Sequence, residues 1–286
     1  MRKTAKRLTA RAVARSFSGT GCRAAHAPRR ELPAWPRSSA ELAAANVALC
    51  AATPVEILEW ATAESPSRVG QVTSFGPTGI VILDHLEQLG LLPQVPVVTI
   101  DTLHLFPETH QLVERARARW ESKGLVLRVA QPENASSAAE FAAQYGERLW
   151  EVDAERFAEL TKVLPLRRAL DDLNVGVWIT GRRSSQGGER SELSVLELDP
   201  LGSDDLERAP RYKLNPLCTW NLTDVWAALR ARDLPYNTLH DGGYTSIGDA
   251  VTTTKAASGA GRERDGRWTG QAKTECGIHV RASASA

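Results

Sequence analysis

Short β-branched runs alternate with helical patterns from residue 71 to residue 183, and this alternation limits the folds open to the chain. The strand-like runs occupy residues 71–73, 95–100, 125–132 and 175–183. The helical patterns between them occupy residues 80–90, 103–120 and 166–173. Strands that alternate with helices favour a mostly parallel sheet covered on both faces. We therefore expect an α/β fold whose site is built from loops at the carboxyl ends of the strands.

Two further helices are predicted outside this alternation, over residues 38–62 and 222–234. The first begins with the letters SSAE, which offer a capping box, and it places Cys50 in an apolar stretch where we expect it to be buried. Beyond Tyr236 the chain becomes rich in Gly, Ser and Arg. We interpret residues 31–240 as one α/β domain and residues 241–286 as a long, poorly packed tail.

The first 30 residues differ in composition from the rest. They contain nine Lys or Arg residues, and the first carboxylate of the chain is Glu31. A basic stretch with Ser, Thr and Ala but no continuous apolar run is typical of an organelle transit peptide. A disordered basic tail or a misassigned start codon fits equally well. A transit peptide predicts a plastid or mitochondrial protein, whereas either of the other two interpretations predicts a cytoplasmic one.

Composition excludes several classes of function. The chain has 35 basic and 34 acidic residues, so no overall basic field predicts binding to nucleic acid. No apolar run is long enough to span a bilayer. The four cysteines, Cys22, Cys50, Cys218 and Cys276, form no C-x-x-C pair, so we expect neither a structural zinc nor an iron–sulfur cluster. A reducing compartment fits this cysteine usage.

The loop S-F-G-P-T-G connects the first strand to its helix and is a candidate anion site. Glycines let the backbone approach a ligand, and the following helix directs N–H groups and the positive end of its dipole into the loop. The loop is neither a Walker A loop nor a G-x-G-x-x-G motif, and a tight strand–helix turn explains it equally well. The candidate ligand-binding residues here are Ser74, Phe75, Gly76, Thr78 and Gly79.

Polar residues also follow two other predicted strands. Asp101 and Thr102 come after the strand that ends at residue 100, where a carboxylate is often functional. The alternative role for Asp101 is to cap the next helix. Arg182 and Arg183 follow the strand that begins at residue 175, and guanidinium groups suit a phosphate or a sulfate. A solvated surface pair is the alternative for these two arginines.

The last dozen residues hold a lone thiol, Cys276, in the stretch K-T-E-C-G-I-H. A thiol reacts as the thiolate, and nearby cations lower its pKa. Cationic residues and a histidine lie near it in sequence: Arg262, Arg264, Arg267, Lys273 and His279. Spacing alone favours a free cysteine in a disordered tail, and a tail folded over an anion site is the alternative.

Together these segments resemble one family, the thioredoxin-dependent phosphoadenylyl-sulfate (PAPS) reductases of sulfate assimilation. The matching stretches are TSFGPTGIVILD, VTIDTLHLFPET, WITGRRSSQGGERSEL, KLNPLCTW, DLPYNTLHDGGYTSIGD and ERDGRWTGQAKTECGIH. The resemblance implies a PP-loop (adenine nucleotide α-hydrolase-like) α/β fold in which Cys276 is the nucleophile. It also implies that the phosphosulfate is contacted by Lys162, Arg264, Arg267 and His279. Leu103 stands where the family pattern has a glycine.

The sister activity, adenylyl-sulfate (APS) reduction, uses an iron–sulfur cluster held by a Cys-Cys pair and a C-x-x-C pair. The corresponding stretches here read FAELTKVLPLRRAL and DAVTTTK, without cysteine. The resemblance therefore implies PAPS as substrate, no bound cofactor, and thioredoxin or glutaredoxin as electron donor. It also implies a homodimer as one assembly. The alternatives are an APS reductase without a cluster, a PAPS-binding protein without activity, and an ATP pyrophosphatase, whose S-G-G-x-D-S loop is missing here.

Overall fold

The computed structural model describes residues 31–65, 67–199, 210–255, 263–264, 266–268 and 277–279. The basic extension over residues 1–30 lies outside the described residues, and so does Cys276. The described residues from Leu32 onward belong to one compact unit. None of the described helices combines the length and apolar character needed to cross a bilayer.

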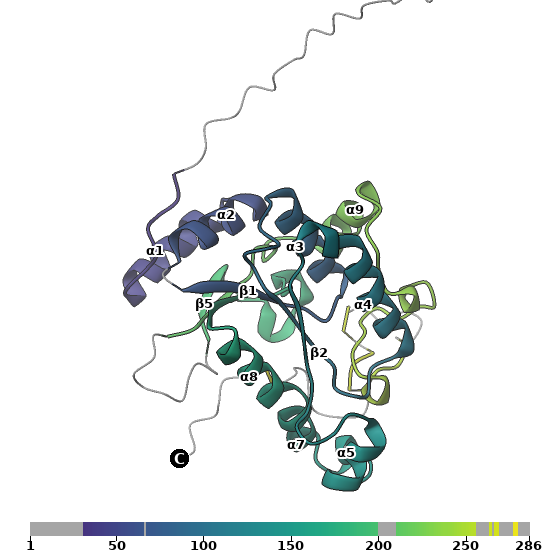
Figure 1. The fold of residues 1–286 in the computed structure, drawn as a ribbon. Coiled ribbons are helices and arrows are strands. Elements are labelled where there is room, and N and C mark those ends of the chain that lie inside the picture. Colours follow the sequence, from purple (N-terminus) through teal and green to yellow (C-terminus); the bar gives the residue numbers. More distant parts are fainter. Residues whose placement is uncertain are drawn as a thin grey trace, which may run out of the picture. The chain divides into compact units, whose positions relative to one another are not determined.

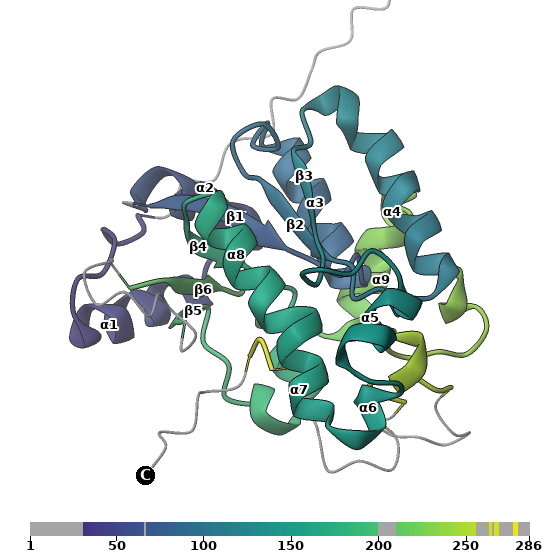
Figure 2. The same ribbon diagram turned by 60° about the horizontal axis from the view of Figure 1, so that its bottom comes forward.

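The described strands form one six-stranded sheet in the order β3-β2-β1-β4-β6-β5 (Figures 1 and 2). Its strands are β1 (Arg68–Val72), β2 (Val97–Ile100), β3 (Leu127–Ala130), β4 (Val175–Ile179), β5 (Leu196–Leu198) and β6 (Tyr212–Leu214). Every neighbouring pair is parallel except β5 and β6, which are antiparallel. The mostly parallel α/β sheet predicted from the alternation is confirmed.

Helices cover both faces of the sheet (Figure 2). They are α1 (Ser39–Cys50), α2 (Pro54–Glu64), α3 (Pro77–Gln88), α4 (Pro107–Trp120), α5 (Ala138–Tyr145), α6 (Leu149–Val152), α7 (Ala154–Ala158), α8 (Leu164–Asp172) and α9 (Leu222–Ala231). Successive strand side chains point to opposite faces, so Val97 and Val177 join the core under α2 and α3, whereas Val98 and Trp178 pack under α8.

The helix predicted over residues 38–62 is in fact two helices, α1 and α2. Pro54 disfavours helical backbone at Thr53 and cannot donate an N–H to a helix that runs through it. Thr53 instead caps α2 in a capping box with Glu56. Ser38 caps α1 by accepting the Glu41 N–H, but the Glu41 carboxylate accepts the Arg37 N–H at 2.6 Å, so only half of the predicted capping box forms. Cys50 ends α1 and is exposed, so the prediction that it is buried was wrong.

The described part of residues 241–286 packs onto the α/β unit more closely than a poorly packed tail would. Asp249 is 1% exposed and Thr253 is 5% exposed. Isolated β-bridges join Asp249 to Leu105 and Thr253 to Arg267. The composition of this stretch concealed its packing, because its contacts are made by single side chains and not by an apolar periodic pattern.

Candidate active site

A cavity of about 250 Å³ lies at the carboxyl ends of the parallel strands. Its wall includes Thr73 after β1, Ile100 at the end of β2, and Thr180 after β4. Eleven of the residues singled out in the sequence line it: Ser74, Phe75, Gly76, Thr78, Gly79, Thr102, Lys162, Arg182, Arg264, Arg267 and His279. The fold thus brings together segments that lie up to about 200 residues apart in the chain.

The S-F-G-P-T-G loop turns sharply between β1 and α3. Phe75 is 1% exposed with a φ of 55°, and its N–H donates to Thr73 Oγ1 at 2.9 Å. Pro77 begins α3 with its fixed φ, and Gly76 is the N-cap, with no side chain to occupy the helix end. The first turn of α3 therefore faces the cavity with backbone N–H groups, an arrangement that suits an anion or a polar ligand group.

Asp101 and Thr102 follow β2 but have different surroundings. The Asp101 carboxylate accepts the Leu103 N–H at 2.9 Å and a Gln131 Nε2–H at 3.1 Å, and it does not line the cavity. It does not cap the next helix either, since the N-cap of α4 is Phe106. Asp101 thus stabilises the turn, whereas Thr102 faces the cavity.

Lys162 reaches the cavity from a π-helical segment, Glu159–Val163, that joins α7 to α8. Its ammonium forms an ion pair with Asp249, whose other carboxylate oxygen accepts the Thr102 hydroxyl at 2.7 Å. Burial by itself would raise the pKa of Asp249, but Lys162 and the Thr102 hydrogen bond outweigh it and hold that pKa below its ordinary value. The carboxylate therefore stays charged and fixes the ammonium at the cavity wall.

The two adjacent arginines after β4 diverge. Arg182 lines the cavity and pairs with Glu197 of β5. Arg183 points behind the cavity wall, is fully buried, and pairs with Glu263 at 2.6 Å. Arg183 therefore anchors the segment that carries Arg264, and it does not line the cavity.

Several cavity residues were not singled out by the sequence analysis. Arg190 is 7% exposed, lines the cavity and donates to Gln186 Oε1 at 2.5 Å. Asp249 and Trp178 were missed as well. Asp249 and Arg190 both fall within stretches quoted for the family resemblance, but nothing in their local sequence separates them from neighbouring polar residues.

Within the described segment Gly277–His279, Ile278 and His279 line the cavity. The His279 ring stacks on Trp178 with a centroid separation of 5.6 Å and an interplanar angle of 9°. Burial, with Arg182 and other cations around it, places the pKa of His279 well below its ordinary value, so the ring is neutral at pH 7. The predicted nucleophile, Cys276, precedes this segment directly but lies outside the described residues.

Arg264 and Arg267 both line the cavity and share one aromatic partner. Their guanidinium carbons lie 5.6 Å and 4.5 Å from the ring centroid of Trp268. Arg267 also donates to the Ile247 carbonyl at 3.2 Å. These contacts hold both charges at the cavity, where an anion would meet them.

Within the part of the chain that the structure describes, no group of three or more His, Cys, Asp or Glu side chains is placed to hold a metal ion. Cys218 is buried and donates to the Leu193 carbonyl at 3.0 Å. Burial raises the pKa of the Cys218 thiol to about 11, so it is not a thiolate at neutral pH. Its role in the described structure is packing.

Comparison with known proteins gives a consistent result. The family model for the phosphoadenosine phosphosulfate reductase domain matches residues 68–255. A phosphoadenosine phosphosulfate reductase of Emericella nidulans is 42% identical over 228 residues, covering 79% of this chain and 71% of its own length. The Saccharomyces cerevisiae protein of the same name is 41% identical over 229 residues, covering 79% of this chain and 84% of its own.

Solved structures agree with the sequence relatives. A PAPS reductase from Candida auris, crystallised as a phosphate complex, superposes with a TM-score of 0.67 at 36% identity, covering 78% of this chain and 100% of that one. An FMN adenylyltransferase from Candida glabrata superposes with a TM-score of 0.50 at 19% identity, which shows a shared fold alone.

Proposed function

Because this chain belongs to the phosphoadenosine phosphosulfate reductase family, we propose that it reduces 3′-phosphoadenylyl sulfate to sulfite and adenosine 3′,5′-bisphosphate in assimilatory sulfate reduction. One observation carries this proposal. The cavity at the strand ends gathers cationic side chains from separate segments, and Ile278 and His279, which follow Cys276 in the chain, lie in the same cavity. An anionic substrate bound there lies next to the segment that carries the thiol.

The cavity has two kinds of lining for the substrate, backbone N–H groups and cationic side chains. The Ser74–Gly79 loop and the first turn of α3 offer backbone N–H groups, and we assign the nucleotide to this side, together with Ile100 and Thr102. Lys162, Arg182, Arg264 and Arg267 neutralise the phosphosulfate and the 3′-phosphate. Burying so much anionic charge is tolerable only with paired cations.

The first chemical step is attack by the Cys276 thiolate on the sulfur of the sulfate group. The new Sγ–S bond forms as the S–O bond to the phosphate breaks, which leaves a Cys-S-sulfonate and releases adenosine 3′,5′-bisphosphate. The departing phosphate oxygen takes up negative charge, and the same cations stabilise it. Neutral His279 lines the same cavity and adds no positive charge to that of the cations.

The second step needs an external dithiol, which we assign to thioredoxin or glutaredoxin. A donor thiolate attacks Cys276 Sγ, the bond to the sulfonate sulfur breaks, and sulfite departs with that electron pair. The second donor thiol then resolves the mixed disulfide and restores the Cys276 thiol. The donor dithiol thereby supplies the two electrons that reduce the sulfate sulfur to sulfite.

The test measures sulfite release from PAPS and from APS with reduced thioredoxin, for the wild type and for Cys276→Ser. We expect turnover of PAPS, little turnover of APS, and background activity for Cys276→Ser with nucleotide binding retained. Cys50→Ser is the matched control, since Cys50 is exposed and does not line the cavity. Full turnover by Cys276→Ser would remove the nucleophile assignment, and equal turnover of APS would remove the substrate assignment. Tight binding of PAPS without sulfite release from the wild type would identify a binding protein instead.

A further inference from the structure

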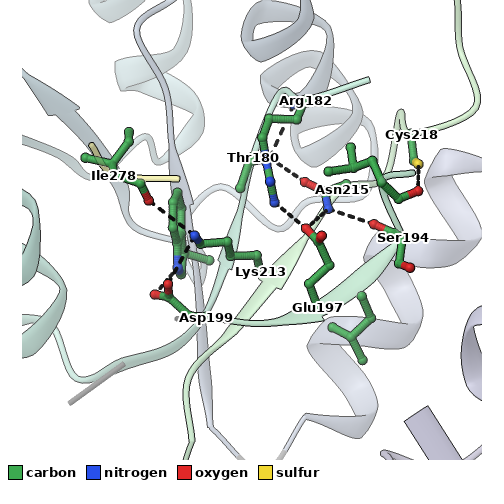
Figure 3. A network of polar contacts seen from close by, with 12 residues as sticks. Thr180, Arg182, Ser194, Glu197, Asp199, Lys213, Asn215, Cys218 and Ile278 are labelled. Atoms are coloured by element: carbon green, nitrogen blue, oxygen red, sulfur yellow. Dashed lines mark hydrogen bonds and ion pairs between the residues drawn. The ribbon is translucent and has the colours of Figure 1, made fainter. Parts of the chain in front are cut away.

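One buried cation next to the site has no part in the proposed chemistry. Lys213 lies on β6 and is 1% exposed. Its ammonium lies 3.2 Å from Asp199 Oδ1, and it also donates a hydrogen bond to the Ile278 carbonyl at 3.2 Å (Figure 3). Burying a lysine costs free energy unless its charge is paired and its N–H donors are used. Here one of those donors is used on the main chain of the C-terminal segment.

Lys213 belongs to a small unit built on the sheet. It is the register partner of Trp178 on the adjacent parallel strand β4, and its ammonium lies 5.0 Å from the centroid of the Trp178 ring system. Trp178 in turn donates its indole N–H to Asp199 at 2.8 Å. Two side chains on the neighbouring strands β4 and β6 and a third directly after β5 thus fix one another, so the unit is rigid.

The same unit makes two separate contacts with the C-terminal segment. Lys213 bonds the Ile278 main chain, and the Trp178 ring stacks on His279. The hydrogen bond from Lys213 fixes the distance of Ile278 from the sheet, and the stacking on Trp178 fixes the orientation of the His279 ring. A hydrophobic side chain of equal length would fill the space of Lys213 but could not donate to the Ile278 carbonyl.

We propose that Lys213 is a positioning residue, which holds Ile278 and His279 against Trp178 and so sets the place from which Cys276 reacts. This inference rests on the proposed function, because it takes Cys276 as the nucleophile. It adds a residue on the central sheet, outside the cations of the cavity, that holds the described residues directly after Cys276.

The first test reads the segment directly and needs no turnover. An imidazole stacked on an indole face has ring-proton resonances shifted upfield, so His279 reports the contact in a spectrum of protein labelled at its six histidines. We expect the upfield resonance in the wild type and its return to an ordinary position in Lys213→Met, both measured at pH 7, where the low pKa of His279 leaves its ring neutral. An unchanged His279 resonance in Lys213→Met would overturn the proposal.

Two variants keep the test decisive if Lys213→Met folds poorly. Asp199→Asn retains an acceptor for the Trp178 N–H and leaves Lys213 bonded to Ile278, so the His279 resonance should stay upfield. The double variant Lys213→Met/Asp199→Asn leaves no uncompensated carboxylate charge at Asp199 and should lose the upfield shift. Leu112→Ala, on the buried face of α4, controls for general loss of stability and should keep the upfield shift. Loss of the shift in Leu112→Ala would show that it follows stability alone and would overturn the proposal.

The second test is kinetic. Misplacing a reacting group by about 1 Å can cost about 100-fold in rate, so kcat for PAPS should fall by about that factor in the double variant, whereas KM stays within about 2-fold. A rise in KM with unchanged kcat would assign Lys213 to substrate binding and overturn the positioning role. Failure of the wild type to release sulfite would defeat the proposed function, yet the His279 resonance would still decide whether Lys213 holds the segment.

Discussion

Asp249 shows how one buried side chain sets the chemistry of the cavity wall. It is 1% exposed and joins Lys162, from the π-helical segment, to Thr102, from the loop after β2. Its pKa is held below the ordinary value, mainly because Lys162 opposes the effect of burial. Asp249 therefore works through Lys162, because the buried ion pair holds the Lys162 side chain at the cavity wall.

Substitution of Asp249 by Asn should cost about 3 kcal/mol of folding free energy at pH 7, since it removes one partner of a buried ion pair. A carboxyl whose pKa is lower in the folded state contributes stability above its unfolded pKa of about 3.9, and this contribution is lost as the pH falls through the folded pKa. The free energy of unfolding should therefore fall less steeply with decreasing pH in Asp249→Asn than in the wild type. Urea unfolding between pH 3 and pH 7 measures both effects.

Asp172→Asn provides the matched control for Asp249. Asp172 pairs with Arg128 at 3.4 Å, but both side chains are more than half exposed, so the pair is screened by water. Removal of this ion pair should leave the free energy of unfolding at pH 7, and its decrease at low pH, almost unchanged. Equal behaviour of the two variants would mean that the Lys162–Asp249 pair contributes nothing beyond a surface ion pair.

Leu103 marks the limit of prediction at this scale. The family resemblance implies a glycine at this position, where the sequence has a leucine, and the structure places Leu103 at a φ of 64°. Left-handed backbone costs an L-residue about 1–2 kcal/mol. The compensation comes from the Asp101 carboxylate and from packing against the cluster of Phe141 and Phe157. That cluster forms about 40 residues later in the chain, so no local pattern could reveal it.

At the scale of elements, the position of α3 depends on its close approach to the end of β1. A Cβ added to Gly79 would overlap Thr73 Oγ1 and lie 3.2 Å from Thr73 Cβ. Thr73 is 6% exposed, and its hydroxyl already accepts the Phe75 N–H, so it cannot move aside freely. Gly79 is therefore required by packing between two elements and not by its backbone conformation.

Gly79→Ala should destabilise the fold by about 1–3 kcal/mol, the usual cost of overpacking. This is opposite in sign to an ordinary helix interior, where Ala is favoured over Gly by about 0.5–1 kcal/mol. KM for PAPS should rise too, because the loop that lines the cavity must shift. Chemical denaturation and steady-state kinetics measure the two effects.

Gly76→Ala tests the same loop without the clash. A Cβ at Gly76 meets nothing nearer than Ser74 Oγ at 3.9 Å, so steric strain is absent and only a small N-cap effect remains. A Gly79→Ala protein that is more stable than the wild type would contradict the close approach of α3 and β1.

Elements with a strong local signal were predicted well, and those defined by distant partners were not. The strands β1 to β4 and the helices α3, α4, α8 and α9 follow β-branched runs and apolar periodicity. Strands β5 and β6 have three residues each and exist because of their pairing: β6 pairs with β4, and β5 pairs with β6. The helix break at Pro54 was readable from its sequence, and the prediction of one helix over residues 38–62 gave that proline too little weight.

At the scale of the whole molecule, net charge and local charge differ. The chain carries a net charge of only +1, which argues against a nucleic-acid partner. The cavity nevertheless gathers five cationic side chains among its described lining, from Lys162, Arg182, Arg190, Arg264 and Arg267, against the carboxylates of Asp249 and Glu263. Composition could not predict this local excess, because the fold creates it by joining separate segments.

This local field predicts a salt dependence of substrate binding. Raising NaCl from 0.1 M to 1 M shortens the screening length from about 10 Å to about 3 Å, so KM for PAPS should rise several-fold while the rate at saturating PAPS changes less. Neutral adenosine is the matched control: its affinity, measured by calorimetry, should stay nearly constant, because it meets the same cavity without charge. A KM for PAPS that is independent of salt would mean that the cations of the cavity are compensated by the carboxylates around them. The phosphosulfate would then be recognised through hydrogen bonds, and the assignment of Lys162, Arg182, Arg264 and Arg267 as its neutralising charges would fail.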